Sequence, residues 1–339
     1  MPSSAAVQAR GGASRALDGR GMRLLLALLA LTLLATFAPV VAPPHAAPPA
    51  SAWVAARAVA LDPSWPGRTR LGALRFLGAW TLTSNDGRFG SISAMHVDGG
   101  QVLAFSDAGW MMRFAAPAVE GGRVAARIGA LPDGPGSPDR KSARDVEAMW
   151  AEGGKAWIAF ERINEVWRFD LRSWRAEAHT QPPILRDWPA NRGPEAMARL
   201  ADGRFILFDE GRGGGGPAAL FSGDPAVPGS RALGLRYAAP AGYRPTDAAR
   251  LPDGSLLVLN RHVSLREGVS AKLVRVRAIS GGVLRGEEVA DFRPPVRVDN
   301  MEALSVTREG GRTILWIASD DNNFPLQRTL LMKFEYAPS

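Results

Sequence analysis

One short pattern occurs five times along the chain, and this repeat constrains the fold more than any other feature of the sequence. Each copy has a Ser, Asp or Glu followed by Ala, then a Gly-containing turn, then an apolar run that ends in a polar residue. The copies are SISAMHVDGGQVLAFSD (91–107), DVEAMWAEGGKAWIAFE (145–161), GPEAMARLADGRFILFDE (193–210), PTDAARLPDGSLLVLNR (245–261) and NMEALSVTREGGRTILWIASDD (300–321). Their anchor residues are Ser93, Glu147, Glu195, Asp247 and Glu302, which lie 48 to 55 residues apart.

Each copy predicts a β-hairpin with polar residues at its open end. The turns DGG, EGG, ADG and PDG supply the positive φ angles that tight hairpins require. Apolar and polar residues alternate in RFILFDE and SLLVLN, as expected for strands. In four copies a polar residue stands 14 positions after the anchor, at Asp107, Glu161, Asp209 and Arg261, and in the fifth its counterpart is Asp320.

Further strand-like segments follow each hairpin, such as EVWRFD, AKLVRVRAI and TLLMKFEY. Four strands in about 50 residues is the size of a propeller blade. We therefore expect an all-β fold, a single β-propeller over residues 70–337, with five blades favoured and a divergent sixth as the alternative. The segment 74–84 would close the ring by completing the last blade. A β-sandwich is the competing architecture, and the fixed spacing of similar units argues against it.

The N-terminal region has the parts of a secretory signal. Four arginines precede the apolar run LLLALLALTLLATFAPVVA, residues 24–42, and small residues follow it. We expect residues 1–45 to be a signal peptide or an inner-membrane anchor and residues 46–69 to be a Pro/Ala-rich linker. Either case places the globular part in the periplasm or outside the cell, with membrane contact only through the N-terminal segment.

Composition excludes several classes of function. The net charge is +8, but it comes almost wholly from arginines spread along the chain, so the basic stripe of a nucleic-acid-binding protein is missing. The chain has no cysteine, which excludes disulfides, thiolate metal sites and cysteine nucleophiles.

In a propeller the open ends of the five hairpins meet around one mouth of the central channel. Carboxylates that converge there repel one another unless a cation or arginines lie among them. Oxygen ligands without cysteine favour Ca²⁺. The expected metal ligands are Glu147, Glu195, Asp247, Asp299, Glu302 and Asp320. The alternative is a purely structural set of ion pairs, because Arg162, Arg192, Arg244 and Arg261 stand beside these positions.

The sequence also resembles a known family, the phytase-like domain, whose description is esterase-like activity of phytase. The resemblance rests on FGSISAM, DVEAM, NRGPEAMARLADGRFILFDEG, YRPTDAARLPDGSLLVLNR and DNMEALSV followed by SDDNNFPLQRTLLMKFEY, and it covers residues 70–337. It implies an exported β-propeller annotated among hydrolases. Ser93 and Arg261 depart from a complete acidic ring.

Three functions follow as hypotheses. The first is a Ca²⁺-dependent hydrolase of phosphoesters or esters with a small anionic substrate, in which Glu195, Glu302, Arg192 and Arg244 act at the reacting centre. The second is a lactonase similar to the gluconolactonase group, with Asn300 or Asn260 among the metal ligands. The third is a non-catalytic propeller that binds a ligand or an envelope protein.

Overall fold

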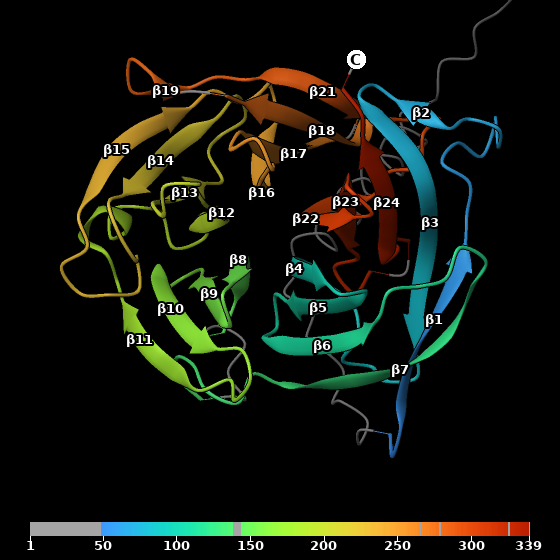
Figure 1. The fold of residues 1–339 in the computed structure, drawn as a ribbon, viewed down its shortest axis with the longest axis horizontal. Helices are drawn as coiled ribbons and strands as arrows, with labels where there is room; N and C mark the ends of the chain where they lie inside the picture. The colour runs from blue at the N-terminus through green and yellow to red at the C-terminus, as the bar shows by residue number, and fades with distance from the viewer. Residues whose placement is uncertain (1–48, 138–143, 265, 278, 325, 339) are drawn as a thin grey trace, which may run out of the picture. The chain divides into compact units, whose positions relative to one another are not determined.

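The computed structural model describes residues 49–137, 144–264, 266–277, 279–324 and 326–338. Five strands surround a central axis in a closed ring, in which each strand contacts the next and the last contacts the first (Figure 1). These innermost strands are β4 (Ile92–Asp98), β8 (Val146–Glu152), β12 (Pro194–Arg199), β16 (Arg244–Arg250) and β22 (Asn300–Glu309). The prediction of a β-propeller is confirmed.

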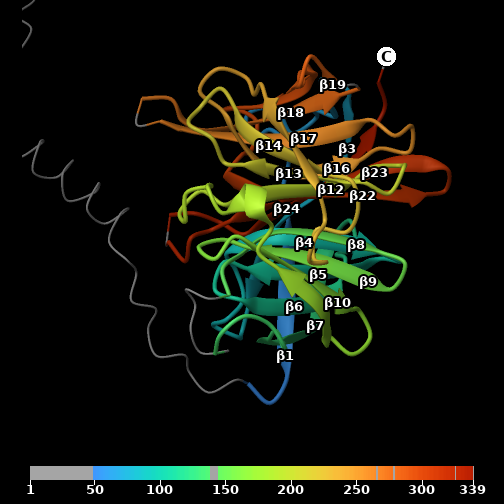
Figure 2. The ribbon, with the colours of Figure 1, turned by 90° about the vertical axis from the view of Figure 1, so that its left-hand side faces the viewer.

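The described strands form five groups of four, which we call blades 1 to 5. Blade 1 continues outward from β4 through β5 (Gln101–Ser106), β6 (Trp110–Ala115) and β7 (Gly121–Ala130), and blade 2 from β8 through β9 (Lys155–Phe160), β10 (Glu165–Asp170) and β11 (Ala176–Thr180). Blade 3 adds β13 (Phe205–Asp209), β14 (Gly216–Phe221) and β15 (Ala232–Tyr237) to β12, and blade 4 adds β17 (Leu256–Ser264), β18 (Gly268–Val276) and β21 (Glu287–Phe292) to β16. In the side view, strands of blade 2 lie below those of blades 3 and 4 (Figure 2).

Blade 5 is completed by the N-terminal part of the domain, as the sequence predicts. It runs from β22 through β23 (Arg312–Asp320) and β24 (Leu330–Tyr336) to β3 (Leu74–Ser84), which pairs antiparallel with β24. The first and last parts of the domain therefore share one sheet, and no strand edge is left between them.

A further strand closes the ring from outside. β1 (Ala52–Ala58) pairs antiparallel with β3 of blade 5 and with β7 of blade 1, so it joins the outer edges of both blades (Figure 1). The sequence predicts a linker over 46–69, but this part of it is a strand. The segment AWVAARA buries Val54 and Ala56 on one face, which is the alternation that β-pairing uses.

Short strands decorate the ring. β2 (Arg70–Leu71) pairs with β3, and β19 (Ile279–Ser280) pairs with β20 (Val283–Leu284), which extends the outer edge of blade 3 in parallel with β15.

The hairpins turn where the sequence predicts. Gly153 and Gly154 join β8 to β9 with φ angles of 62° and 78°, a conformation that only glycine adopts at little cost.

The hydrophobic core lies between the blades. Buried residues form five clusters, and each cluster combines side chains from two neighbouring blades around the ring. Trp157 of blade 2, for example, packs against Phe205 of blade 3 with ring centroids 5.0 Å apart. This packing fixes the blades relative to one another and thereby the positions of their innermost strands.

The predicted leader, residues 1–45, lies outside the described residues. Within the described part of the chain, no helix has the length and apolarity needed to cross a membrane.

Candidate metal and active site

Every innermost strand carries an irregularity in its pairing near its first residue. One residue is skipped in the register between each innermost strand and its neighbour. The skipped residues are Ser93, Glu147, Glu195, Thr246 and Glu302. A β-bulge re-aims its side chain out of the alternating pattern, so these five residues form an inner ring at one mouth of the channel.

Three members of the inner ring are glutamates, and their carboxylates lie close enough to act on one another. Burial raises the pKa of Glu147, and the carboxylates of Glu195 and Asp145 raise it further. Burial also raises the pKa of Glu195, with Glu210 and Glu161 as the next causes. Glu195 is only 8% exposed, and neither Glu195 nor Glu147 makes a side-chain hydrogen bond to any residue that the structure describes.

The other two members of the inner ring are hydroxyl residues, and both connect neighbouring blades. Ser93 Oγ donates to the Val146 carbonyl oxygen at 2.5 Å, and Thr246 Oγ1 donates to the Met301 carbonyl oxygen at 3.0 Å. Each accepting carbonyl directly precedes a glutamate of the inner ring. The two hydroxyls therefore hold the strands that carry Glu147 and Glu302.

A second ring is formed by the residue that follows or ends the second strand in four blades, and in blade 4 by Arg261, which lies within β17 opposite Arg244. Its members are Asp107, Glu161, Glu210, Arg261 and Asp320. The sequence prediction placed Asp209 here, but Asp209 pairs with Pro194 inside the sheet, so Glu210 takes the position. The turn of blade 3 is one residue longer than the turns of blades 1 and 2, which displaces the count from the anchor by one.

Arg261 is the one cation of the second ring, and it bridges two blades. Its Nη1 contacts Glu302 and the Asn300 side-chain oxygen, and its Nη2 lies 3.3 Å from Glu210 Oε1. Arg244 Nη1 also reaches Glu210 Oε1, at 3.0 Å. Glu302 and Glu210 are thus held by guanidinium groups, whereas Glu147 and Glu195 are not.

Three carboxylates of blade 2 form the most compact acidic group among the described residues. One oxygen from each of Asp145, Glu147 and Glu161 lies within 4.8 Å of the others. Burial and the neighbouring Asp145 raise the pKa of Glu161 to about 7. Arg162 Nε approaches Asp145 Oδ2 from outside at 2.8 Å.

This group fits a hard divalent cation. Calcium takes oxygen ligands at 2.3–2.6 Å, so two of its ligands lie at most about 5 Å apart, which agrees with the spacing of the three oxygens. The Glu195 carboxylate lies near enough to this group to raise the pKa of Glu147, after the larger effect of burial. Buried carboxylates without a partner are costly, and a bound cation would compensate them.

Two of the predicted metal ligands are used for structure. Asp247 is not the anchor of its blade, because the skipped residue is Thr246, and its carboxylate accepts the backbone N–H groups of Ala248 and Leu304 at 2.7 and 2.6 Å. Asp299 accepts the N–H groups of Asn300 and Arg328. These oxygens terminate and connect strands.

Asp320 lies at the mouth beside Asp107 and Glu302. Its Oδ1 accepts the Asn322 N–H at 2.6 Å. Burial raises its pKa, and the carboxylate of Asp107 from blade 1 is the next cause. The structure therefore brings together Glu147, Glu195, Glu302 and Asp320, while Asp247 and Asp299 serve the backbone.

The predicted arginines divide in a similar way. Arg244 and Arg261 reach the acidic rings directly. Arg192 is half-buried near Asp209, where its charge opposes the effect of burial on the pKa of that carboxyl.

Neither asparagine named for a lactonase site is available as a ligand. The Asn260 side chain is fully buried, where its oxygen accepts from Tyr237 Oη at 3.1 Å, and the Asn300 oxygen is bound to Arg261.

Sequence reasoning missed Asp145 as a member of the site, and it named Glu210 only together with the neighbouring Asp209. A signal for Asp145 exists, because in DVEAM it stands two positions before Glu147, on the same face of an extended strand. The signal for Glu210 is the adjacent pair Asp209-Glu210, whose register only the turn length decides.

Fold and site together define a β-propeller with a group of buried carboxylates at one mouth of its channel. The family model for the phytase-like family, described as esterase-like activity of phytase, matches residues 87–323, and the chain belongs to this family.

Several solved structures are similar in fold. Hydrazine synthase from Kuenenia stuttgartiensis is 10% identical with a TM-score of 0.37, and the match covers 70% of this chain and 58% of that one. Glutaminyl cyclase from Myxococcus xanthus is 8% identical with a TM-score of 0.46, over 77% and 96% of the two chains. The Cps50 (Swd1) beta-propeller domain from Myceliophteria thermophila is 15% identical with a TM-score of 0.36, over 69% and 64%. A search of curated proteins finds no match.

Proposed function

We propose that this protein is an exported, Ca²⁺-dependent hydrolase that acts on phosphoesters or esters of small anionic substrates. The observation that carries the proposal is the blade 2 group, Asp145, Glu147 and Glu161, beside the buried and unpaired Glu195. The family description, esterase-like activity of phytase, supports the reaction class. The N-terminal sequence supports export.

The cation would be held by Asp145, Glu147 and Glu161. When bound, such an ion supplies Lewis-acid polarisation of a phosphoryl or carbonyl oxygen.

The remaining residues of the mouth would act on the substrate. Arg244 and Arg261 place two guanidinium groups in the second ring, where they would orient an anionic group. No described residue hydrogen-bonds the Glu195 side chain, so its carboxylate, once ionised beside the cation, would accept a proton from a water molecule at the mouth. Glu302 would keep Arg261 oriented through their ion pair.

The test combines cation binding with a panel of substrates. Calorimetry should show saturable Ca²⁺ binding to the wild-type domain, and the variants D145N and E147Q should lose it. The control is E177Q on β11, which makes the same change on an exposed strand of the same blade.

Hydrolysis is measured with aryl phosphates, phytate and aryl esters, with Ca²⁺ and with EDTA. Turnover that requires Ca²⁺ and disappears in E195Q supports the proposal. Ca²⁺ binding without turnover of any substrate would indicate a structural cation and contradict the proposed hydrolase activity. Absence of Ca²⁺ binding would contradict the proposed cation site itself.

A further inference from the structure

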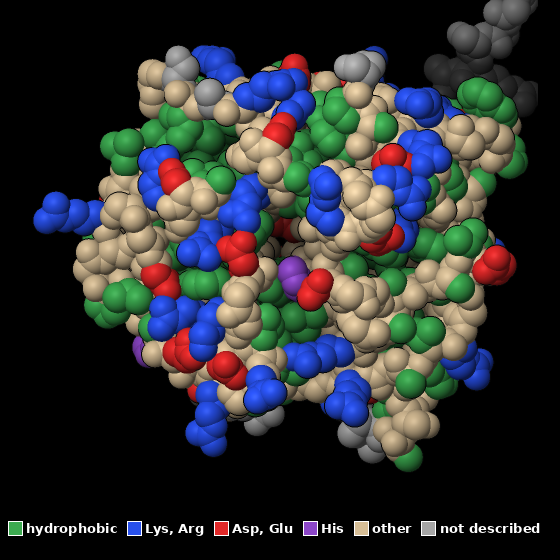
Figure 3. All heavy atoms as spheres, viewed as in Figure 1, with side chains coloured by type: hydrophobic (Ala, Val, Ile, Leu, Met, Phe, Trp, Pro, Cys, Tyr) green, Lys and Arg blue, Asp and Glu red, His purple; other side chains and the backbone are tan. Residues whose placement is uncertain are grey.

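The opposite mouth of the channel carries a second group of charges that the proposed function does not use. Glu152, Arg199 and Arg250 are the last residues of β8, β12 and β16, whose other ends carry Glu147, Glu195 and Thr246. Figure 3 views the ring along the axis and shows a hollow near its centre on a face where Lys and Arg side chains predominate.

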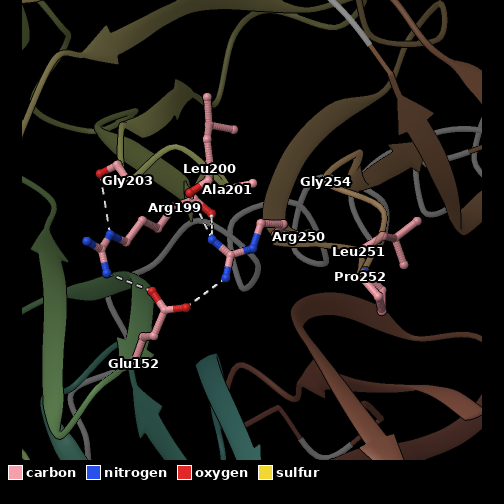
Figure 4. Close-up of a pocket in the computed structure, with 9 residues that line it drawn as sticks. All are labelled: Glu152, Arg199, Leu200, Ala201, Gly203, Arg250, Leu251, Pro252 and Gly254. Atoms are coloured by element: carbon pink, nitrogen blue, oxygen red, sulfur yellow. Dashed lines mark hydrogen bonds and ion pairs between the residues drawn. The ribbon is translucent and has the colours of Figure 1, made fainter. Parts of the chain in front are cut away.

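One carboxylate is shared by two guanidinium groups. Arg199 Nη1 donates to Glu152 Oε2 and Arg250 Nη2 donates to Glu152 Oε1, both at 2.7 Å (Figure 4). The two arginines stand in equivalent positions of successive repeats, RLADG and RLPDG. Two positive charges against one negative charge leave the group with a net charge of +1.

Both guanidinium groups are held in place by the protein. Arg250 Nη1 donates to the carbonyl oxygens of Arg199 and Leu200, at 3.0 and 2.8 Å, and its guanidinium lies 5.3 Å from the ring centroid of Trp150. Arg199 lies over Trp157 at 5.7 Å. The side chain of Arg199 nevertheless remains 34% exposed, and that of Arg250 23% exposed. A ligand would meet donors that are already ordered, which lowers the entropic cost of binding.

These charges border a cavity of about 470 Å³. Its other walls are the hairpin turns of blades 3 and 4, at residues 200–203 and 251–254, and the Leu200 and Leu251 side chains extend away from the charged group toward the core (Figure 4). Glu152 is the one carboxylate in its lining. A smaller cavity of about 210 Å³ adjoins it at Glu152 and Arg250 and also contains His96 and Trp150.

The neighbouring His96 adds no charge to the cavity at neutral pH. Burial lowers the pKa of His96, so its imidazole is neutral at pH 7. The cavity thus offers a surplus of positive charge in a mainly polar lining.

We propose that this cavity binds a small organic anion, a carboxylate or phosphate monoester, through Arg199 and Arg250. In the absence of ligand, Glu152 occupies the guanidinium edges that the anion would otherwise share. The built-in carboxylate therefore competes with the ligand, and this competition separates the proposal from a clamp that only ties blades 2, 3 and 4 together.

The experiment measures binding of benzoate and phenyl phosphate by calorimetry at low ionic strength in EDTA. Acetate and methyl phosphate are the matched probes that lack the aromatic ring. We expect saturable binding that depends on the anionic head group, and the comparison of the carboxylates with the phosphates identifies the preferred one.

The variant E152Q should bind the preferred anion about tenfold more tightly, because it removes the internal competitor. The variant R199Q should bind it at least about tenfold more weakly. Controls are D202N and R204Q, which make the same charge changes in an exposed ion pair on the same hairpin, outside the cavity lining.

Two results would overturn the proposal. One is the absence of saturable binding of any probe at about 10 mM, a weak affinity even for a fragment. The other is an equal gain in anion affinity in E152Q and D202N, which would show that only the overall charge of the protein determines the binding. If R199Q does not fold, the comparison of anion binding between E152Q and D202N still tests the proposal. A lower unfolding temperature of E152Q without tighter anion binding would show that Glu152 only ties the blades together.

Discussion

Asp145 and Glu161 face each other across the open end of the blade 2 hairpin. The Glu161 N–H donates to the Asp145 carbonyl oxygen at 2.9 Å, and their carboxylate oxygens lie within 4.8 Å of each other and of Glu147. The backbone hydrogen bond holds two like charges together that would otherwise separate. Near neutral pH these carboxylates must therefore either share a proton, as in the metal-free protein, or bind a cation.

The first prediction is a loss of stability of the metal-free protein as the pH rises. The pKa of Glu161 is about 7 in the folded state against 4.5 for an ordinary glutamate. Between these values the folded state retains a proton that the unfolded chain has lost, so the stability is complete below about pH 4.5 and declines up to about pH 7. The decline due to Glu161 is at most about 3 kcal/mol. Urea unfolding in EDTA at several pH values measures it.

The variant E161Q should flatten this decline, and E177Q on the exposed β11 should not. Ca²⁺ in place of EDTA should restore the stability at pH 7 if the site binds the cation. A wild-type stability in EDTA that rises from pH 5 to pH 7 would contradict the assignment of a raised pKa.

The second prediction concerns the unpaired carboxylate of Glu195. Its burial and the nearby charges of Glu210 and Glu161 disfavour its ionised form. Replacement by glutamine keeps the shape and removes the charge, so E195Q should stabilise the metal-free protein at pH 7 by on the order of 1 kcal/mol. Thermal unfolding in EDTA measures this, with E287Q in an exposed pair on blade 4 as the control.

The hypothesis of an active carboxylate further requires that E195Q, although more stable, hydrolyses no substrate. A variant that is destabilised in EDTA would show that Glu195 has a hydrogen-bonding role in the fold.

Sequence reasoning recovers the ring but not the register at its mouth. Repeat spacing and turn residues predict the hairpins and the closure by 74–84, because alternation and glycine position are local properties of the chain. A bulge shifts the register by one residue and turns side chains to the other face, and no local rule announces its place. Asp247 is therefore mistaken for an anchor because it precedes Ala, whereas the skipped residue is Thr246.

The third prediction tests this assignment of Asp247 to the backbone. Its carboxylate accepts two N–H groups, one of them from β22 of the next blade. The variant D247N can satisfy only one of them with its oxygen, so we expect a destabilisation of about 1–3 kcal/mol. Its Ca²⁺ affinity, measured by calorimetry on the folded variant, should equal that of the wild type. An affinity reduced as strongly as in D145N would instead make Asp247 a ligand.

The fourth prediction concerns the hydroxyl that takes the anchor position in blade 4. Thr246 Oγ1 donates to the Met301 carbonyl oxygen and so holds the strand that carries Glu302. We expect T246V to lose about 1 kcal/mol of stability, because a buried carbonyl loses its donor, while T246S retains the hydrogen bond. Urea unfolding of the two variants decides, and a T246V variant more stable than T246S would show that the methyl group, not the hydroxyl, matters here.

The last prediction is that Arg261 is required for folding of the mouth, whatever its role toward a substrate. Its guanidinium contacts Glu302 and Glu210, which are both buried, from a position that the four other blades fill with a carboxylate. Removal of the cation in R261M leaves the buried Glu302 carboxylate without its guanidinium and Glu210 with Arg244 alone, and loss of one partner of a buried ion pair typically destabilises by about 3–5 kcal/mol. The exposed pair Arg277–Glu287 supplies the control, since R277M should change the stability by less than about 0.5 kcal/mol. The double variant R261M/E302Q removes one of the stranded charges and should regain part of the loss; if it is no more stable than R261M, the ion pair with Glu302 is not what Arg261 contributes.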